Sequence, residues 1–307
     1  MKMKDDLARG TLIGLAGITV WSTSGVLIAY LLRNFPLQPL QLALWRNLFV
    51  VFALGLVLAV GWPHLLRLQT RFLGFMALYG LVLSLFNAIW TVSLRENGAA
   101  VATVLGYSSA GFTVVLAYFL FGERIGPFKA AAVVFSLGGC ALVANAFDAS
   151  VWQLQPIGII SGLLSGVIFS AYTLFGKQGA RMGLHTFTSL FYSFLFGTLF
   201  IFIFNLIPFI PGSGASTTGL LPTIPPEAWG WMAFVAVGPT LLGFGLYNLS
   251  MDHLPASVAN LLATTEPVMT AIEAYIFLGE RLTPLQLAGS LVILAAVVLV
   301  QKGAKET

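Results

Sequence analysis

The chain has 307 residues, of which 58% are hydrophobic and only 8% are charged. A soluble domain carries about 25% charged residues, so this composition excludes a soluble globular protein and indicates an integral membrane protein. The net charge of +4 does not point to a nucleic-acid partner, because the basic residues are spread along the chain instead of forming one patch.

Hydropathy divides the chain into about ten apolar segments, each close to the ~20 residues that a helix needs to cross a bilayer. We expect these spans at residues 10–32, 38–61, 72–93, 98–121, 127–146, 156–176, 185–207, 228–250, 256–278 and 284–301. Their continuous apolar character excludes a transmembrane barrel, whose strands show about ten alternating residues. The sequence therefore predicts an all-α integral membrane protein with ten transmembrane helices.

The first apolar segment follows a short basic stretch, as the core of a signal peptide does. It is longer than the usual 7–15 residues of such a core, and no small-residue cleavage pattern follows it. We therefore expect a permanent span. The single cysteine, Cys140, lies inside the fifth expected span, so no disulfide within the chain and no thiolate metal site is expected.

Lysine and arginine residues near the span ends predict the orientation, because cytoplasmic loops are enriched in them. One set of loops and termini contains Lys2, Lys4, Arg9, Arg67, Arg71, Arg124, Lys129, Lys177, Arg181, Lys302 and Lys305. The opposite set contains only Arg33, Arg95 and Arg281. We expect a multi-pass protein of the cell (inner) membrane with both termini in the cytoplasm.

Several polar and aromatic side chains fall near the middle of the expected spans, away from the two membrane surfaces where aromatic belts lie. Rings and hydroxyl groups at this depth suit an organic solute with an apolar part. The expected substrate-binding residues are Trp21, Trp45, Arg46, Tyr79, Asn87, Trp90, Tyr107, Ser108, Ser109, Tyr192 and Glu266. For any single aromatic residue among them, packing between helices is the alternative interpretation.

Three ionisable residues lie within the expected spans: Arg46, Glu266 and Glu273. Each would cost about 2.5–3.5 kcal/mol at the bilayer centre, so each should face protein or a water-filled cavity. Arg46 and Glu266 lie at similar depth, which permits a direct or water-mediated pair. Glu266 either takes up a coupling proton or faces a substrate amino group, and Arg46 faces a carboxylate; a static buried ion pair is the alternative.

The ninth expected span carries Glu266 and Glu273 seven residues apart, nearly on one helix face. Pro267 follows Glu266 directly and removes a backbone donor, a disruption that membrane helices tolerate where they line a cavity. The sequence therefore predicts that this span forms one wall of a central cavity.

The stretches "LFGERIGP" and "FLGERLTP" occur 157 positions apart, and the similarity continues through the spans that precede them. A weaker match at a shift of 148 positions relates the first span to the sixth. We therefore expect two repeats, residues 1–150 and 151–307, each with five spans. Because five is odd, the second repeat enters the membrane from the opposite side, and such inverted repeats typically surround a central cavity near the midplane.

The paired pattern of an apolar span that ends in "LFGER" or "FLGER", with a proline three residues later, resembles the doubled EamA domain of the drug/metabolite transporter superfamily. The stretch from Thr264, "TTEPVMTAIEAYIFLGERLTP", carries most of this resemblance, which covers nearly the whole chain. It implies a ten-helix exporter of small organic metabolites, including amino acids in one branch. In the first copy Ala110 stands where the family often has proline, so the helix break there is expected to be absent or moved.

These features together predict a secondary transporter that moves a small amphipathic metabolite by alternating access. Amino acids with aromatic or large apolar side chains are the first substrate expectation, from the midspan rings, Arg46 and Glu266. Export follows from the resemblance alone. A passive channel or facilitator pore is the main alternative, an exporter of unrelated metabolites or drugs is another, and a membrane-bound enzyme is a distant third.

The expected partners are a small-molecule substrate and the lipid bilayer, with no required protein partner. No catalytic residues, cofactor or metal site are expected, since the three histidines fall in loops or at span ends and no ATP-binding loop motif occurs. The two Gly-Glu-Arg stretches, at Gly122 and at Gly279, are expected to be structural anchors or gate supports and not substrate ligands.

Overall fold

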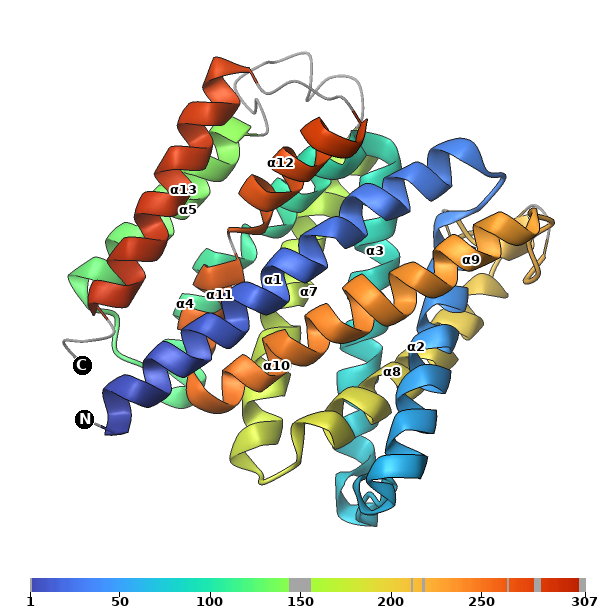
Figure 1. Ribbon diagram of the computed structural model, residues 1–307, viewed down its shortest axis with the longest axis horizontal. Helices are drawn as coiled ribbons and strands as arrows, with labels where there is room; N and C mark the ends of the chain where they lie inside the picture. The colour runs from blue at the N-terminus through green and yellow to red at the C-terminus, as the bar shows by residue number, and fades with distance from the viewer. Residues whose placement is uncertain are drawn as a thin grey trace.

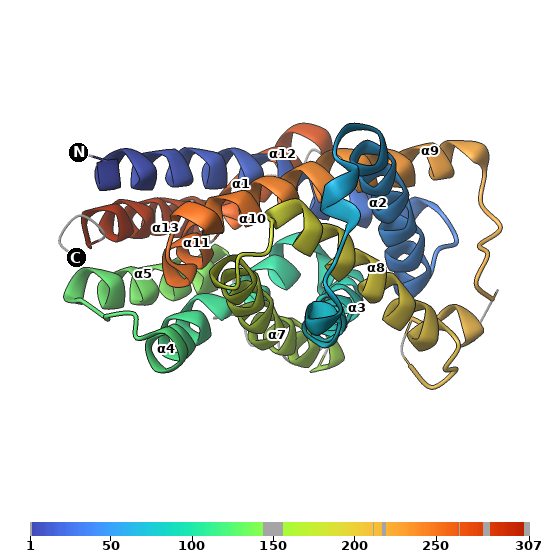
Figure 2. The same cartoon turned by 90° about the horizontal axis from the view of Figure 1, so that it is seen from below.

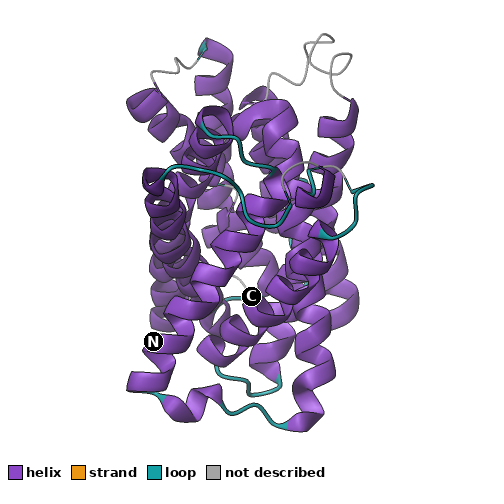
Figure 3. Cartoon of the chain, turned by 90° about the vertical axis from the view of Figure 1, so that its right-hand side faces the viewer, coloured by secondary structure: helices purple, strands orange, loops and turns teal. Residues whose placement is uncertain are grey.

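The computed structural model describes residues 2–143, 156–210, 212–216, 219–263, 265–278 and 283–303. Every regular element in these ranges is a helix, and Figure 3 shows helices joined by loops. The elements are α1 (Lys2–Asn34), α2 (Pro39–Gly61), η1 (Pro63–Leu66), η2 (Thr70–Phe72), α3 (Leu73–Gly106), α4 (Ser109–Phe121), α5 (Pro127–Val143), α7 (Pro156–Arg181), α8 (Thr186–Asn205), η3 (Gly214–Ser216), α9 (Pro226–Val235), η4 (Ala236–Leu242), α10 (Gly243–His253), α11 (Ala256–Ala263), α12 (Glu266–Leu278) and α13 (Pro284–Gly303).

Six helical stretches in the described ranges are long and apolar enough to cross a membrane. They are Leu7–Asn34, Pro39–Gly61, Thr70–Glu96, Ile160–Arg181, Thr186–Asn205 and Pro226–His253. They coincide with six of the expected spans. The remaining expected spans fall on α4, α5, α11 with α12, and α13, and stay a prediction.

Helix α3 covers both the third expected span and the start of the fourth, where hydropathy predicts a break near residues 93–98. Its 34 residues would measure about 51 Å if straight, more than the ~30 Å apolar core of a bilayer. A methyl group placed on Gly106 would lie only 3.9 Å from Cδ1 of Trp90, although 16 straight helical residues span about 24 Å. The chain therefore folds back on itself within α3.

The helices pack in a repeated arrangement. Helix α1 lies along α10 and α12, while α7 lies along α3 and α4. Helices α5 and α13 pack mainly against each other and stand side by side at one edge of the bundle (Figures 1 and 2). Helix α1 begins and α13 ends at the same end of the molecule (Figure 1).

The segment from Pro226 to His253 is one bent helix in which α9 and α10 flank the π-helical turn η4. Pro239 lies inside this turn, where its missing N–H removes one hydrogen bond of the regular helix. Gly238 directly precedes Pro239 in the sequence. The bend brings Phe244 of α10 against Trp21 of α1, with 4.6 Å between the ring centroids.

Glycine allows close helix approach at a few contacts. A β-carbon on Gly80 of α3 would lie 2.5 Å from Cβ of Phe196 and 2.8 Å from the backbone nitrogen of Gly197 on α8. A larger side chain there must separate the two helices, because neither neighbouring atom can rotate away. Gly74, in the first turn of the same helix, faces open space.

We predict that Gly80→Val lowers the stability by about 1–3 kcal/mol, because overpacking forces the backbones apart. Gly74→Val is the matched control on the same helix, with an expected change within about 0.5 kcal/mol. Thermal unfolding of the two detergent-purified variants measures the difference. Equal midpoints would show that α3 and α8 do not depend on this close approach.

Candidate functional site

A cavity lies where α1, α2, α3, α7, α10 and α12 meet. Its lining residues are Trp21, Ser24, Arg46, Phe86, Asn87, Trp90, Thr103, Gly106, Tyr107, Phe169, Phe244 and Glu266. It leaves about 20 Å³ for the centres of water molecules, which is room for one or two waters. An organic molecule enters this space only if the surrounding helices move apart.

The cavity lies beside two breaks in the helices. Helix α3 ends at Gly106 and α4 begins at Ser109, while α11 ends at Ala263 and α12 begins at Glu266. The repeat of 157 positions aligns Ser109 with Glu266, so the two breaks fall at matching places. The expectation that the first break is absent or moved because of Ala110 is wrong: α4 begins at the aligned residue without a proline.

Glu266 is 3% exposed, and its Oε2 accepts a hydrogen bond from the hydroxyl group of Tyr107. Tyr107 lies at the first helix break and Glu266 at the second, so this bond joins them. A buried carboxylate needs such donors, because burial in apolar surroundings without a partner is costly. The neighbouring Pro267 places Glu266 in the first turn of α12, where the helix dipole favours a negative charge.

Arg46 is 2% exposed, and its Nη2 donates to Oδ1 of Asn87 over 2.7 Å. Its Nε is buried and has no hydrogen-bond partner. Both residues are described, and no ion pair within 4.0 Å joins Arg46 to Glu266 although both line the cavity. The direct pair that the sequence permits is therefore absent, because Asn87 and Tyr107 hold the two groups separately.

Glu273 is half-buried, and its Oε1 accepts a hydrogen bond of 2.6 Å from Oγ of Ser22. Its other oxygen, Oε2, is buried without a partner. Glu273 does not line the cavity that Glu266 lines. The two acids of this segment therefore occupy different surroundings.

The structure brings together about half of the residues that the sequence assigns to substrate binding. Those that line the cavity are Trp21, Arg46, Asn87, Trp90, Tyr107 and Glu266. Those that do not line it are Trp45, Tyr79, Ser108, Ser109 and Tyr192.

Trp45 and Tyr192 point to the ends of the bundle. The Nε1 of Trp45 donates to the carbonyl oxygen of Leu220, over 2.9 Å, and its ring lies edge-on against Trp229. The hydroxyl group of Tyr192 donates to the carbonyl oxygen of Leu66 in η1, over 2.8 Å. Each ring anchors a connecting segment, although both residues fall near the middle of an expected span.

Tyr79 and Ser109 form buried hydrogen bonds away from the cavity, with side chains of α10 and α11 respectively. The hydroxyl group of Tyr79 donates to Oδ1 of Asn248, over 3.2 Å, and Ser109 Oγ donates to Oδ1 of Asn260, also over 3.2 Å. Ser108 lies at the first helix break, with its Oγ buried and without a partner. These three residues do not line the cavity.

The residues that the sequence assigns to substrate binding omit half of the cavity lining: Ser24, Phe86, Thr103, Gly106, Phe169 and Phe244. The internal repeat contains a signal for one of them, because the shift of 148 positions aligns Trp21 with Phe169. These two rings meet edge-to-face across the cavity, with 5.5 Å between their centroids. Phe86 packs on Phe169 at 5.0 Å and completes the aromatic wall.

The cavity combines a cation, a carboxyl group and aromatic walls. Arg46 can bind a carboxylate through two parallel hydrogen bonds, and Glu266 can accept hydrogen bonds from an ammonium group. The rings can cover an apolar side chain. In the part of the chain that the structure describes, no group of His, Cys, Asp and Glu residues is arranged to hold a metal ion.

Comparison with known proteins indicates the protein family. The sequence model of the EamA-like transporter family matches twice, over residues 8–145 and 156–301. An uncharacterized transporter of Pseudomonas aeruginosa is 29% identical over 90% of this chain and 88% of its own. An uncharacterized inner membrane transporter of Salmonella typhimurium is 25% identical over 95% of both chains.

Two further matches concern function and fold. A probable amino-acid metabolite efflux pump of Escherichia coli K12 is 24% identical over 92% of this chain and 91% of its own. A protein of known crystal structure superposes on 98% of this chain and 99% of its own, with a TM-score of 0.74 at 20% identity. This similarity supports the fold alone. The family and the relatives carry the names of transporters and not of enzymes.

We predict that Tyr107→Phe destabilises the protein by about 1–3 kcal/mol, because it removes a hydrogen bond to a buried carboxyl group. Tyr118→Phe is the control, since Tyr118 is exposed on α4. The thermal unfolding midpoints in detergent provide the comparison. Equal shifts in the two variants would show that the bond between the two helix breaks adds nothing to stability.

Proposed function

The chain belongs to the EamA-like transporter family, and on that premise we propose that it is a secondary transporter that exports small amphipathic metabolites by alternating access. One observation carries the proposal: a buried arginine and a buried glutamate line one cavity without pairing with each other. Charges inside a membrane protein are costly and typically serve a substrate or ion pathway.

We propose an architecture of ten transmembrane helices in two inverted repeats, residues 1–150 and 151–307. Three observations support it. The family model matches once in each half, the breaks before Ser109 and Glu266 are aligned, and α1 packs on α10 and α12 as α7 packs on α3 and α4. Inverted repeats commonly place a substrate site between the halves, near the midplane.

The proposed location is the inner membrane, with both termini in the cytoplasm. The excess of Lys and Arg in one set of loops supports this orientation, and a relative carries the name of an inner membrane transporter. In this orientation Arg124, Lys129, Lys177 and Arg181 lie on the cytoplasmic side.

Amino acids with aromatic or large apolar side chains are the proposed substrates. Arg46 would bind the carboxylate, Glu266 would accept hydrogen bonds from the amino group, and Trp21, Phe86 and Phe169 would cover the side chain. The name of the Escherichia coli relative supports this class of substrate. Glu266 is also the proposed site of a coupling proton.

The size of the cavity favours a carrier over an open channel. Its space for one or two waters is too small for an amino acid, so passage requires the helices to move apart. A saturable carrier therefore fits the structure better than a continuous pore does.

We predict that Arg46→Gln and Glu266→Gln change selectivity in opposite directions. In proteoliposomes the first variant should lose its preference for phenylalanine over phenylalanine amide, which lacks the carboxylate. The second should lose its preference for phenylalanine over 3-phenylpropionate, which lacks the amino group, and should lose its dependence on a proton gradient. Losses of roughly 10-fold or more are expected for each missing charge-assisted bond.

Arg95→Gln is the control for this pair, because Arg95 is partly exposed and bonds to Glu96 and Gln38 away from the cavity. It should retain the selectivity of the unmodified chain. Unchanged selectivity in Arg46→Gln would assign the arginine a purely structural role.

Counterflow tests the transport mechanism itself. Proteoliposomes loaded with unlabelled phenylalanine should accumulate labelled phenylalanine transiently, and the initial rate should saturate with concentration, because a carrier exposes one site to each side in turn. Liposomes that contain the Gly74→Val variant, which leaves the site unaltered, should show the same behaviour. A rate that rises linearly without accumulation would indicate a channel.

A further inference from the structure

One face of α7 runs from the cavity to the C-terminal end of this helix, where Lys177 and Arg181 lie. Phe169 lines the cavity, and Tyr172, Thr173, Gly176 and Lys177 follow it at helical spacing. The distance along the helix from Phe169 to Lys177 is about 12 Å. This face therefore covers the whole depth between the substrate cavity and one surface.

The matching face of α10 fills the space opposite α7. The rings of Tyr247 and Phe169 stack with their centroids 6.0 Å apart. The hydroxyl oxygen of Tyr247 lies 3.1 Å from Oγ1 of Thr173, and Nδ2 of Asn248 donates to the hydroxyl oxygen of Tyr172 over 2.8 Å. All these side chains are buried, so no open route leads from the cavity to this surface between α7 and α10.

Most of these contacts are hydrogen bonds between uncharged groups and contacts between rings. Water can replace such hydrogen bonds when the two helices separate, so the interface can open without leaving a buried charge unpaired. At Gly176 a β-carbon would lie 2.5 Å from Cε of Met251 and 3.0 Å from the hydroxyl oxygen of Tyr79, so side chains of α10 and α3 pack directly on this glycine. The interface between α7 and α10 is therefore closed in this structure, but its contacts can be exchanged for contacts with water when the helices separate.

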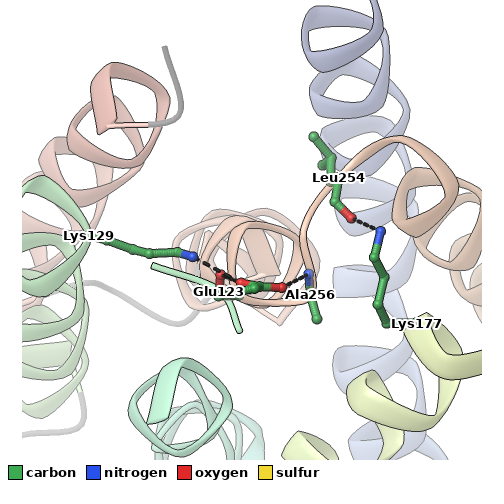
Figure 4. Close-up of polar contacts among 6 residues, drawn as sticks. Glu123, Lys129, Lys177, Leu254 and Ala256 are labelled. Carbon is green, nitrogen blue, oxygen red and sulfur yellow. Dashed lines mark hydrogen bonds and ion pairs between the residues drawn. The ribbon is translucent and has the colours of Figure 1, made fainter. Parts of the chain in front are cut away.

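Lys177 holds the end of α10 at the surface. Its Nζ donates to the carbonyl oxygen of Met251, over 2.9 Å. It also donates to the carbonyl oxygen of Leu254, over 2.7 Å (Figure 4). These carbonyl groups lie at the C-terminal end of the helix, where they have no partner in the helix and where a cation is favoured by the helix dipole.

Glu123 holds the start of α11, directly beyond the same turn. Its Oε1 accepts a hydrogen bond of 3.0 Å from the backbone N–H of Ala256, and its Oε2 accepts one from the hydroxyl group of Ser257. Lys129 of α5 forms an ion pair of 2.9 Å with Oε2 (Figure 4). A carboxylate at a helix N-terminus binds the N–H groups that the helix leaves unpaired.

The backbone brings Glu123 to this position. Gly122 ends α4 in the left-handed conformation, with φ of 67°, and its N–H and that of Glu123 bond back to Tyr118 and Ala117. The first Gly-Glu-Arg stretch therefore closes the helix before it. The second stretch, at Gly279, lies outside the described residues.

Glu123 is ionised in this arrangement. Burial raises the pKa of its carboxyl group, but the hydrogen bond from Ser257 and the charge of Lys129 outweigh burial, so the pKa lies below its ordinary value. The carboxylate therefore keeps both its negative charge and its full capacity to accept hydrogen bonds at neutral pH.

We propose that the interface between α7 and α10 is the inner gate of the transporter, and that Glu123 is the latch that holds it closed. The turn between α10 and α11 is fixed by Lys177 on one side and by Glu123 on the other. Opening requires this turn to leave Glu123, which belongs to the other half of the chain. The inference rests on the proposed transport function, but its test does not need a substrate.

A buried cysteine on the α7 face measures whether the gate opens. The reporter is Thr173→Cys in a chain whose single cysteine is removed by Cys140→Ser, because Thr173 is fully buried one turn from Lys177. A membrane-impermeant maleimide is applied to vesicles from the face that carries Lys177. With Glu123→Ala in this background, we expect the labelling rate to rise at least 10-fold.

Matched variants distinguish the loss of the Glu123 contacts from the loss of a negative charge elsewhere in the protein. Glu96→Gln removes an acid that pairs with Arg95 away from this turn and should label at the rate of the reporter chain. Lys129→Gln removes the ion pair but retains the bonds to Ala256 and Ser257, so its labelling should rise less than that of Glu123→Ala. Labelling of Glu123→Ala at the rate of the reporter chain would overturn the proposal.

A crosslink tests the same latch if Glu123→Ala does not fold. Glu123→Cys with Ser257→Cys, in a chain that also carries Cys140→Ser and Thr173→Cys, should protect the reporter once the pair is oxidised, and reductant should restore its labelling. Labelling is read at position 173 alone, by mass spectrometry of the peptide that contains it, because reduction also frees the thiols at positions 123 and 257. Equal labelling in the oxidised and the reduced chain would contradict the latch. Since the readout is thiol access, this outcome is distinct from a failure to transport amino acids.

Discussion

The need to satisfy charged groups inside a membrane protein determines the arrangement of this structure. Arg46 and Glu266 are both buried, and each has its own neutral partner, Asn87 and Tyr107 respectively. If the two side chains paired with each other, each charge would already be neutralised, and neither group would be available to bind a substrate. Because they are held apart, the cavity retains a cation and a carboxyl group that a zwitterionic molecule can bind.

The cavity and the proposed gate share helices α7 and α10. Phe169 and Phe244 line the cavity, and the following turns of the same two helices close the route toward Lys177 and Glu123. A substrate that pushes these rings apart therefore acts directly on the helices that form the gate. The bonds at the turn between α10 and α11 determine how much displacement is needed before the gate opens.

The sequence predicted the class of fold and much of the cavity, because long apolar segments and rare buried charges are strong signals. It did not determine which way each side chain points. Trp45 and Arg46 are adjacent, yet Arg46 lines the cavity and Trp45 bonds to Leu220, since neighbouring residues differ by about 100° around a helix. Hydropathy also did not show that residues 73–106 form one helical element, α3, in which the chain folds back on itself. Nor did it show that a helix break precedes Ser109 in the absence of a proline.

In the proposed function, Arg46 and Glu266 act separately, on the two ends of one substrate. A cryo-electron microscopy structure with saturating phenylalanine would show both contacts at once. We expect density between the two side chains, with the carboxylate at Arg46, the amino group toward Glu266 and the ring beside Trp21 and Phe169. Density at another place, or an Arg46–Glu266 ion pair with no ligand between the two groups, would contradict it.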